Sequence, residues 1–84
     1  MAETAAATQA PAIPLSMVHA GKTAIVAKVK GREDIRRHLG NLGFVEGSEI
    51  YVASSSGANL IVSIKGARFG LDTKVAQHIM VVEP

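Results

Sequence analysis

The 84-residue chain contains no cysteine and no tryptophan, and only one tyrosine and two phenylalanines. Without cysteine, neither a disulfide framework nor thiolate ligation of zinc is available. The scarcity of aromatic rings disfavours a groove for proline-rich peptides and a surface that stacks single-stranded bases, because both are built from such rings. No run approaches the roughly 18 apolar residues of a membrane-spanning helix, so no direct membrane insertion is expected.

A strong charge of one sign is also missing. The formal net charge is +2, and basic and acidic residues alternate along the chain without a cluster. Proteins that neutralise phosphates usually carry a clustered basic face, so the sequence disfavours nucleic acid as a partner. The chain shows no secretory or targeting pattern, and we expect a cytoplasmic protein.

Composition divides the chain into two parts. Residues 1–12 are mostly alanine and threonine, with neither apolar periodicity nor a helix cap, and we expect a disordered N-terminal tail. Residues 13–84 are enough for one small folded domain without disulfides.

The clearest local signal is a short amphipathic helix with a well-defined end. Ile35, Leu39 and Leu42 follow at i, i+4 and i+7, which places them on one helical face. Gly43 stands where the chain needs a positive φ to leave the helix, and Phe44 is then placed to pack back on Leu39. These residues predict a helix that begins near Arg32 or Glu33 and lies on a hydrophobic core.

The rest of the domain is predicted to be mainly β. Apolar and polar residues alternate in short runs that predict five strands: Thr23–Val29, Glu49–Ser54, Leu60–Ile64, Ala67–Leu71 and Ile79–Val82. Lys65–Gly66 predicts a tight hairpin turn, residues 54–59 a mobile polar loop, and Asp72 the cap of one helical turn over residues 73–78. Short strands with tight connections favour a small closed or nearly closed five-stranded barrel, with one inserted α-helix and a short late helical turn.

No catalytic or cofactor-binding group stands out. The serines at 54–56 have no partnered base, and the glycines do not follow a phosphate-binding spacing. His19, His38 and His78 are widely separated and show no metal-ligand spacing. We therefore expect no enzyme activity, no cofactor and no metal site.

Four exposed residues are the candidates for contact with a partner. The adjacent Arg36 and Arg37 either keep the helix surface soluble or anchor an acidic partner, for which the planar guanidinium is well suited. Tyr51 faces away from the Ile50–Val52 side of its strand, as an exposed contact or as part of a second barrel wall. Arg68 is the fourth candidate, on the strand after the hairpin.

The same segments resemble the FeoA family, small cytosolic proteins associated with bacterial ferrous-iron uptake. The most specific part is the Arg-x-x-Leu-Gly-x-Leu-Gly-Phe run from Arg36 to Phe44, and Gly21, Gly47, Asn59–Val62 and Lys65–Phe69 match as well. The resemblance implies an SH3-like barrel with an inserted helix. It also implies a partner, the membrane permease FeoB, whose cytoplasmic part carries a GTP-binding domain.

Three functional hypotheses follow. The first is a non-enzymatic docking module that binds the cytoplasmic part of a FeoB-type permease and modulates transport, with contacts through the helix face and residues 54–59. The second is a nucleic-acid-binding small barrel, which would use the basic residues Lys28, Lys30, Arg36, Arg37 and Arg68. The third is a metal-responsive or self-associating regulator, in which exposed strand edges would make a homo-oligomer.

Overall fold

The computed structural model describes residues 11–84 of the chain. Residues 1–10 of the expected tail therefore lie outside the described residues, and the division of the chain at residue 12 stays a prediction. Pro11 and Ala12 are exposed and precede the first strand.

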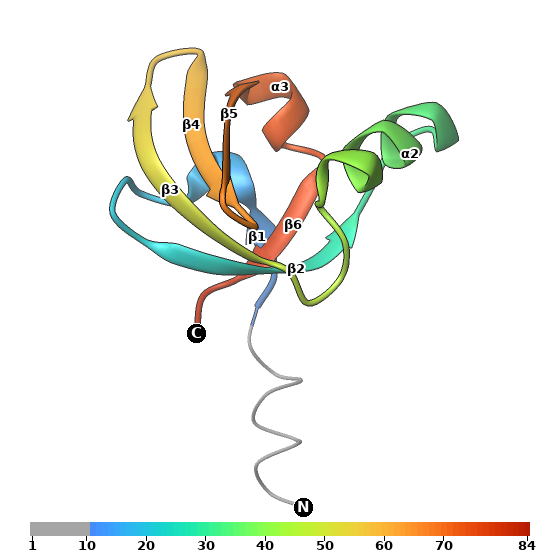
Figure 1. The fold of residues 1–84 in the computed structure, drawn as a ribbon, viewed down its shortest axis with the longest axis horizontal. Coiled ribbons are helices and arrows are strands. Elements are labelled where there is room, and N and C mark those ends of the chain that lie inside the picture. The colour runs from blue at the N-terminus through green and yellow to red at the C-terminus, as the bar shows by residue number, and fades with distance from the viewer. Residues whose placement is uncertain (1–10) are drawn as a thin grey trace, which may run out of the picture.

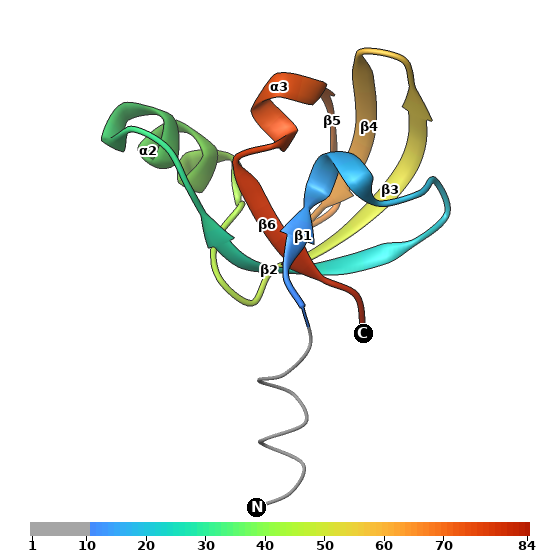
Figure 2. The same cartoon turned by 180° about the vertical axis from the view of Figure 1, so that it is seen from behind.

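One antiparallel sheet curls around the core of the domain (Figures 1 and 2). Its strands are β1 (Ile13–Pro14), β2 (Thr23–Val29), β3 (Glu49–Ser56), β4 (Asn59–Ile64), β5 (Ala67–Asp72) and β6 (Ile79–Val82), in the spatial order β1-β6-β2-β3-β4-β5. The helical elements are η1 (Leu15–Met17), α2 (Glu33–Leu42) and α3 (Thr73–Ala76). In both views α3 lies between the β3–β4 hairpin tip and α2. Among the described residues no ladder joins β1 to β5, so the sheet stays open along that seam.

The predicted mainly-β fold is confirmed, but three details of the sequence prediction were wrong. The sheet has six strands rather than five, since Ile13–Pro14 pairs with β6 and was missed. Two residues that include a proline give no alternating pattern, so only the tertiary contact reveals this strand. The late helix is also shorter than predicted and ends at Ala76.

The third error concerns the predicted loop at 54–59. These residues extend β3 and begin β4, with Ser54, Ser55 and Ser56 opposite Ile61, Leu60 and Asn59 beyond a bulge. Only Gly57 and Ala58 make the turn, and the backbone amide of Thr73 donates to the Ala58 carbonyl at 2.7 Å. Three successive serines show no alternation of apolar and polar residues, so only their pairing with β4 identifies them as part of a strand.

The core is formed by alternate strand residues, as the sequence predicted for β3 and β4. Ile50 and Val52 are buried on β3, and Tyr51 between them is exposed. On β4 the buried residues are Leu60, Val62 and Ile64, and β6 adds Ile79 and Val81. The periodicity of two places these side chains on the inner face of the sheet.

One face of helix α2 packs against this core. Leu39 is 1% exposed, and Ile35 and Leu42 pack partly buried against the same cluster. Gly43 has φ +111°, its amide donates to the Gly40 carbonyl, and the Phe44 amide donates to the Leu39 carbonyl, both at 3.0 Å. This is the two-bond αL ending that the sequence predicted. It turns the chain so that Phe44 enters the core, with its ring centroid 6.2 Å from that of Phe69.

Candidate functional site

A cleft of about 340 Å³ lies between α2 and α3. We call it the α2–α3 cleft; it is lined by Asp34, Ile35, His38, Leu39, Lys74, Val75 and His78. On the α3 side of the cleft, the helix begins after Asp72. The Asp72 carboxylate accepts a hydrogen bond from the Lys74 amide at 2.8 Å and so caps the short helix. Ile35, Leu39 and Val75 give the cleft an apolar lining, while the two histidines, Asp34 and Lys74 add polar groups. An apolar side chain with a polar neighbour would suit this lining.

A second depression lies on another side of the same helix. This α2–β2 groove, of about 580 Å³, is lined by Lys28, Val29, Arg36, Gly40, Phe44, Val45 and Glu46. Within residues 11–84, Arg36 forms no ion pair, whereas Arg32 and Arg37 each lie beside a carboxylate. Two positive charges, on Lys28 and Arg36, and one negative charge, on Glu46, line the groove, so it favours an acidic group. Val45, whose side chain is 43% exposed, adds an apolar contact.

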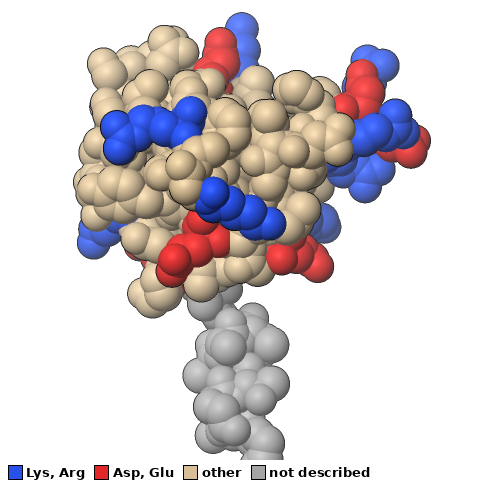
Figure 3. Space-filling view, viewed as in Figure 1, with Lys and Arg blue, Asp and Glu red and all other residues tan. Residues whose placement is uncertain are grey.

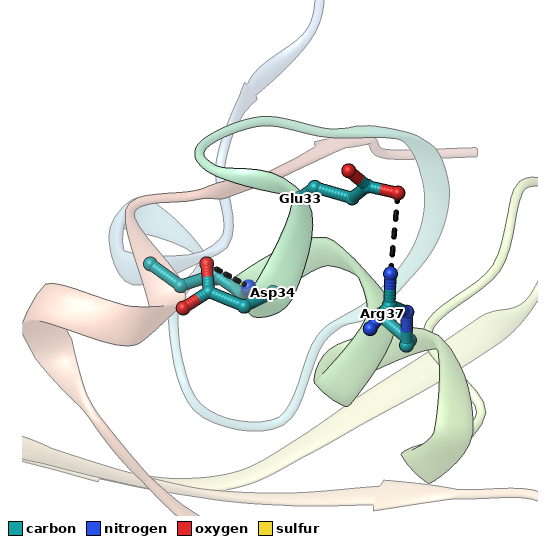
Figure 4. A network of polar contacts seen from close by, with 4 residues as sticks. Glu33, Asp34 and Arg37 are labelled. Carbon is teal, nitrogen blue, oxygen red and sulfur yellow. Dashed lines mark hydrogen bonds and ion pairs between the residues drawn. The ribbon is translucent and has the colours of Figure 1, made fainter.

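The first turn of α2 carries the charged contacts shown in Figure 4. The Arg37 Nη2 atom lies 3.2 Å from Glu33 Oε2, one helical turn away, and the Asp34 carboxylate accepts from the Ile35 amide. The Arg32 Nε atom lies 3.8 Å from Asp34 Oδ1. These side chains are largely exposed, so the ion pairs stabilise the fold little. Arg37 is thus already paired, and its guanidinium is less available to a partner than that of Arg36.

Tyr51 and Arg68 lie apart from the helix, on the outer face of the sheet. Tyr51 is paired with Ser63 on β4, and Ser63 is paired with Arg68 on β5, so the three form one row across neighbouring strands. Both predicted residues are exposed. The structure therefore divides the four candidates into two on α2 and two on this row, and their role in partner binding stays a prediction.

The sequence prediction missed the α3 side of the cleft. Lys74, Val75 and His78 belong to a helical turn of four residues and its end, too short to show an amphipathic pattern. A signal was nevertheless present, because Val75 and His78 follow the Asp72 cap at a spacing of three and so share one side of the turn.

Charges of both signs are mixed over the surface. In the view of Figure 3, basic and acidic side chains lie side by side over α2, and blue and red side chains also adjoin elsewhere on this face. No set of three or more histidine, aspartate or glutamate side chains in residues 11–84 is arranged to hold a metal ion. Nor does any helix in this range have the length and hydrophobicity needed to cross a membrane.

The fold and the two depressions define a class, a small antiparallel β-barrel domain with an inserted helix and surface clefts beside that helix. The model of the FeoA domain matches residues 13–83, and the chain belongs to the FeoA family. This confirms the resemblance drawn from the Arg36–Phe44 run. No curated protein matches the chain.

Two solved structures of FeoA proteins are similar to this chain in both sequence and fold. A FeoA protein described as an iron uptake regulatory protein is 29% identical, with 88% of this chain and 100% of that chain covered and a TM-score of 0.83. The FeoA of Stenotrophomonas maltophilia, crystallised with zinc and described as a prokaryotic SH3 domain protein, is 30% identical over 82% of this chain and 88% of that one, with a TM-score of 0.73. The predicted SH3-like barrel is thereby confirmed.

A regulator contains the same fold as one part of a longer chain. A manganese-dependent transcriptional repressor is 25% identical over 90% of this chain, with a TM-score of 0.82, but only 44% of the repressor is covered. The likeness to this repressor is therefore confined to less than half of its length.

Proposed function

We propose that the chain is a cytoplasmic, non-enzymatic docking module of ferrous-iron uptake. It binds the cytoplasmic part of a FeoB-type, GTP-binding permease and modulates transport. Membership of the FeoA family supports the iron-uptake context, and the S. maltophilia relative has itself been put forward as an activating factor for ferrous-iron transport.

The α2–α3 cleft is the observation that carries the docking proposal. It combines an apolar lining with polar groups in an accessible depression, which is the usual make-up of a binding pocket. A protruding apolar side chain of the permease would enter between Ile35 and Val75. An acidic group beside that side chain would reach Lys74.

The α2–β2 groove gives the same helix a second contact. Arg36 has no carboxylate partner in the described part of the chain and lies with Lys28 along the groove. Arginine is enriched among the residues that dominate protein interfaces. A partner that holds α2 from both sides would therefore place an acidic group on Arg36 and an apolar one in the cleft.

Titration calorimetry with the soluble cytoplasmic domain of the permease tests this surface. Val75→Asp puts a charge into the cleft, and Val82→Asp is its matched control, since Val82 is also half-buried but lies at the far end of β6 from α3. Arg36→Glu is paired with Lys22→Glu, a charge reversal in the turn before β2. Far-UV circular dichroism checks that each variant is folded.

Both cleft and groove variants are expected to weaken binding by roughly tenfold, which corresponds to about 1.4 kcal/mol. The two controls should leave the dissociation constant within about twofold of the original value, because Val82 and Lys22 line neither the cleft nor the groove. Equal losses for variant and control, or no binding by the unmodified protein, would contradict the proposal.

The nucleic-acid-binding and metal-responsive hypotheses gain no specific support from the geometry. Mixed charges over α2 offer a nucleic acid no continuous basic surface in the view of Figure 3. The nucleic-acid-binding and metal-responsive functions stay predictions from the sequence, and neither is developed further.

A further inference from the structure

The outer edge of β5 has no neighbouring strand in the part of the chain that the structure describes. Outside the strand ladders and helix α3, no backbone hydrogen bond involves Arg68, Gly70 or Asp72. The Asp72 carbonyl, as the N-cap of α3, accepts the first hydrogen bond of that helix. Gly70 is exposed, and because glycine has no side chain, this exposure belongs to its backbone. Such an edge presents unpaired N–H and C=O groups to which another strand can add.

The hairpin between β4 and β5 determines which backbone groups point outward. Lys65 and Gly66 have φ of +51° and +82°, as a type I′ turn requires, and the turn joins Ile64 to Ala67. The hydrogen bond across such a turn makes Ile64 and Ala67 a hydrogen-bonded pair. Hydrogen-bonded and non-bonded pairs then alternate along an antiparallel ladder, and this register runs without a shift to the end of β5. The residues whose N–H and C=O groups point away from β4 are therefore Arg68, Gly70 and Asp72.

We propose that β5 pairs antiparallel with β5 of a second copy of this chain, about a two-fold axis at Gly70. In this register Arg68 faces Asp72 of the second copy, and Gly70 faces Gly70 of the second copy. All three outward N–H groups then find a carbonyl acceptor, and the Asp72 carbonyl takes its second bond there, beside the one to α3. A shift by two residues in either direction leaves one of the three residues without a partner. At the axis, where the two backbones are closest, no side chain stands in the way.

Charge complementarity favours a second copy over an unrelated peptide. Arg68 and Asp72 are two steps to either side of Gly70, on the same exposed face of β5, and carry opposite charges. Two-fold symmetry brings each into a cross-strand pair with the other, so two attractive pairs form at once. Asp72 uses one carboxylate oxygen to cap α3, and the other oxygen stays available to Arg68 of the second copy.

β5 lacks two of the usual protections of an exposed strand edge. The strand contains no proline and no bulge, and its charges attract rather than repel in the paired arrangement. This self-association goes beyond the docking function, and it uses a surface other than the clefts beside α2.

Sedimentation equilibrium of the purified chain, from about 10 μM to about 1 mM, measures the dimer dissociation constant. Arg68→Asp places like charges opposite each other twice and should weaken the dimer at least about tenfold. The double exchange of Arg68→Asp with Asp72→Arg restores opposite charges and should recover most of the affinity. Lys22→Asp is the control and should leave the constant unchanged. Circular dichroism checks the fold of each variant, since Asp72→Arg also removes the cap of α3.

Amide hydrogen exchange of the unmodified chain gives an independent result. On raising the concentration, the amides of Arg68, Gly70 and Asp72 should become protected, while those of Phe69 and Leu71, bonded to β4, are protected throughout. A chain that is monomeric at about 1 mM overturns the proposal. So does a dimer that Arg68→Asp leaves intact, or one that protects no alternate amides of β5. No permease takes part in these experiments, so their outcome is independent of the docking proposal.

Discussion

Two glycines of the same helix end should respond in opposite directions when each is changed to alanine. Gly43 has φ +111°, a conformation that a side chain disfavours. Gly40 lies in regular helix, and beyond its chain neighbours and the backbone of its own helix no atom lies within 4 Å of an added Cβ. An added Cβ at Gly43 would meet the Ile64 Cδ1 atom at 3.7 Å, an ordinary contact, so the strain there arises from the backbone alone.

The expected magnitudes follow from these conformations. Gly43→Ala should lower the free energy of unfolding by about 1–2 kcal/mol, the cost of a left-handed L-residue. Gly40→Ala should raise it by roughly 0.5–1 kcal/mol, because alanine loses less backbone entropy in a helix than glycine does. Alanine at these two positions, three residues apart, should thus separate the free energies of unfolding of the two variants by about 1.5–3 kcal/mol.

Urea unfolding followed by far-UV circular dichroism measures both values. For a domain of this size the free energy of unfolding falls by about 1 kcal/mol for each molar increase in urea. The urea concentration at the midpoint of unfolding should therefore fall by about 1–2 M for Gly43→Ala and rise by roughly 0.5–1 M for Gly40→Ala. Shifts of the same sign, or no loss for Gly43→Ala, would refute the assignment of Gly43 as the left-handed end of α2.

Three further variants test other parts of the fold. Leu39→Ala should cost about 2–5 kcal/mol in urea unfolding, since the side chain is 1% exposed, and a loss below about 1 kcal/mol would contradict the docking of α2 on the core. Asp72→Ala should lower stability by about 1 kcal/mol through loss of the α3 cap, measured as a lower thermal midpoint; an unchanged midpoint would argue against that hydrogen bond. Glu33→Gln should cost no more than about 0.5 kcal/mol, because the ion pair with Arg37 is exposed, and a larger effect that survives high salt would contradict this.

Most of the fold could be predicted from short segments of the sequence. The αL ending at Gly43, the alternation in β3 and β4, the Lys65–Gly66 turn and the Asp72 cap are all decided by a few neighbouring residues, and each is found as predicted. The errors fall where tertiary contacts decide. β1 is a strand only because β6 lies beside it, and the serines of β3 pair only because β4 supplies partners.

The candidate site was harder to predict from the sequence, because each of the two depressions is formed by elements far apart in the sequence. Arg36 was identified as an exposed cation, but its place beside Lys28 follows from how α2 lies against β2. The α2–α3 cleft joins residues 34–39 to residues 74–78, and no sequence pattern links these two segments. The same holds for the outward edge of β5, which requires the ladder register as well as the strand itself.

Chemical-shift mapping tests the docking function most directly. The ¹⁵N-labelled chain is titrated with the unlabelled cytoplasmic domain of the permease, and every amide is followed in the same experiment. If α2 and α3 form the docking surface, the largest shifts cluster at Ile35, His38 and Val75 around the α2–α3 cleft, with a second group near Arg36. An unchanged spectrum at saturating partner, or shifts confined to the strands away from α2 and α3, would contradict it.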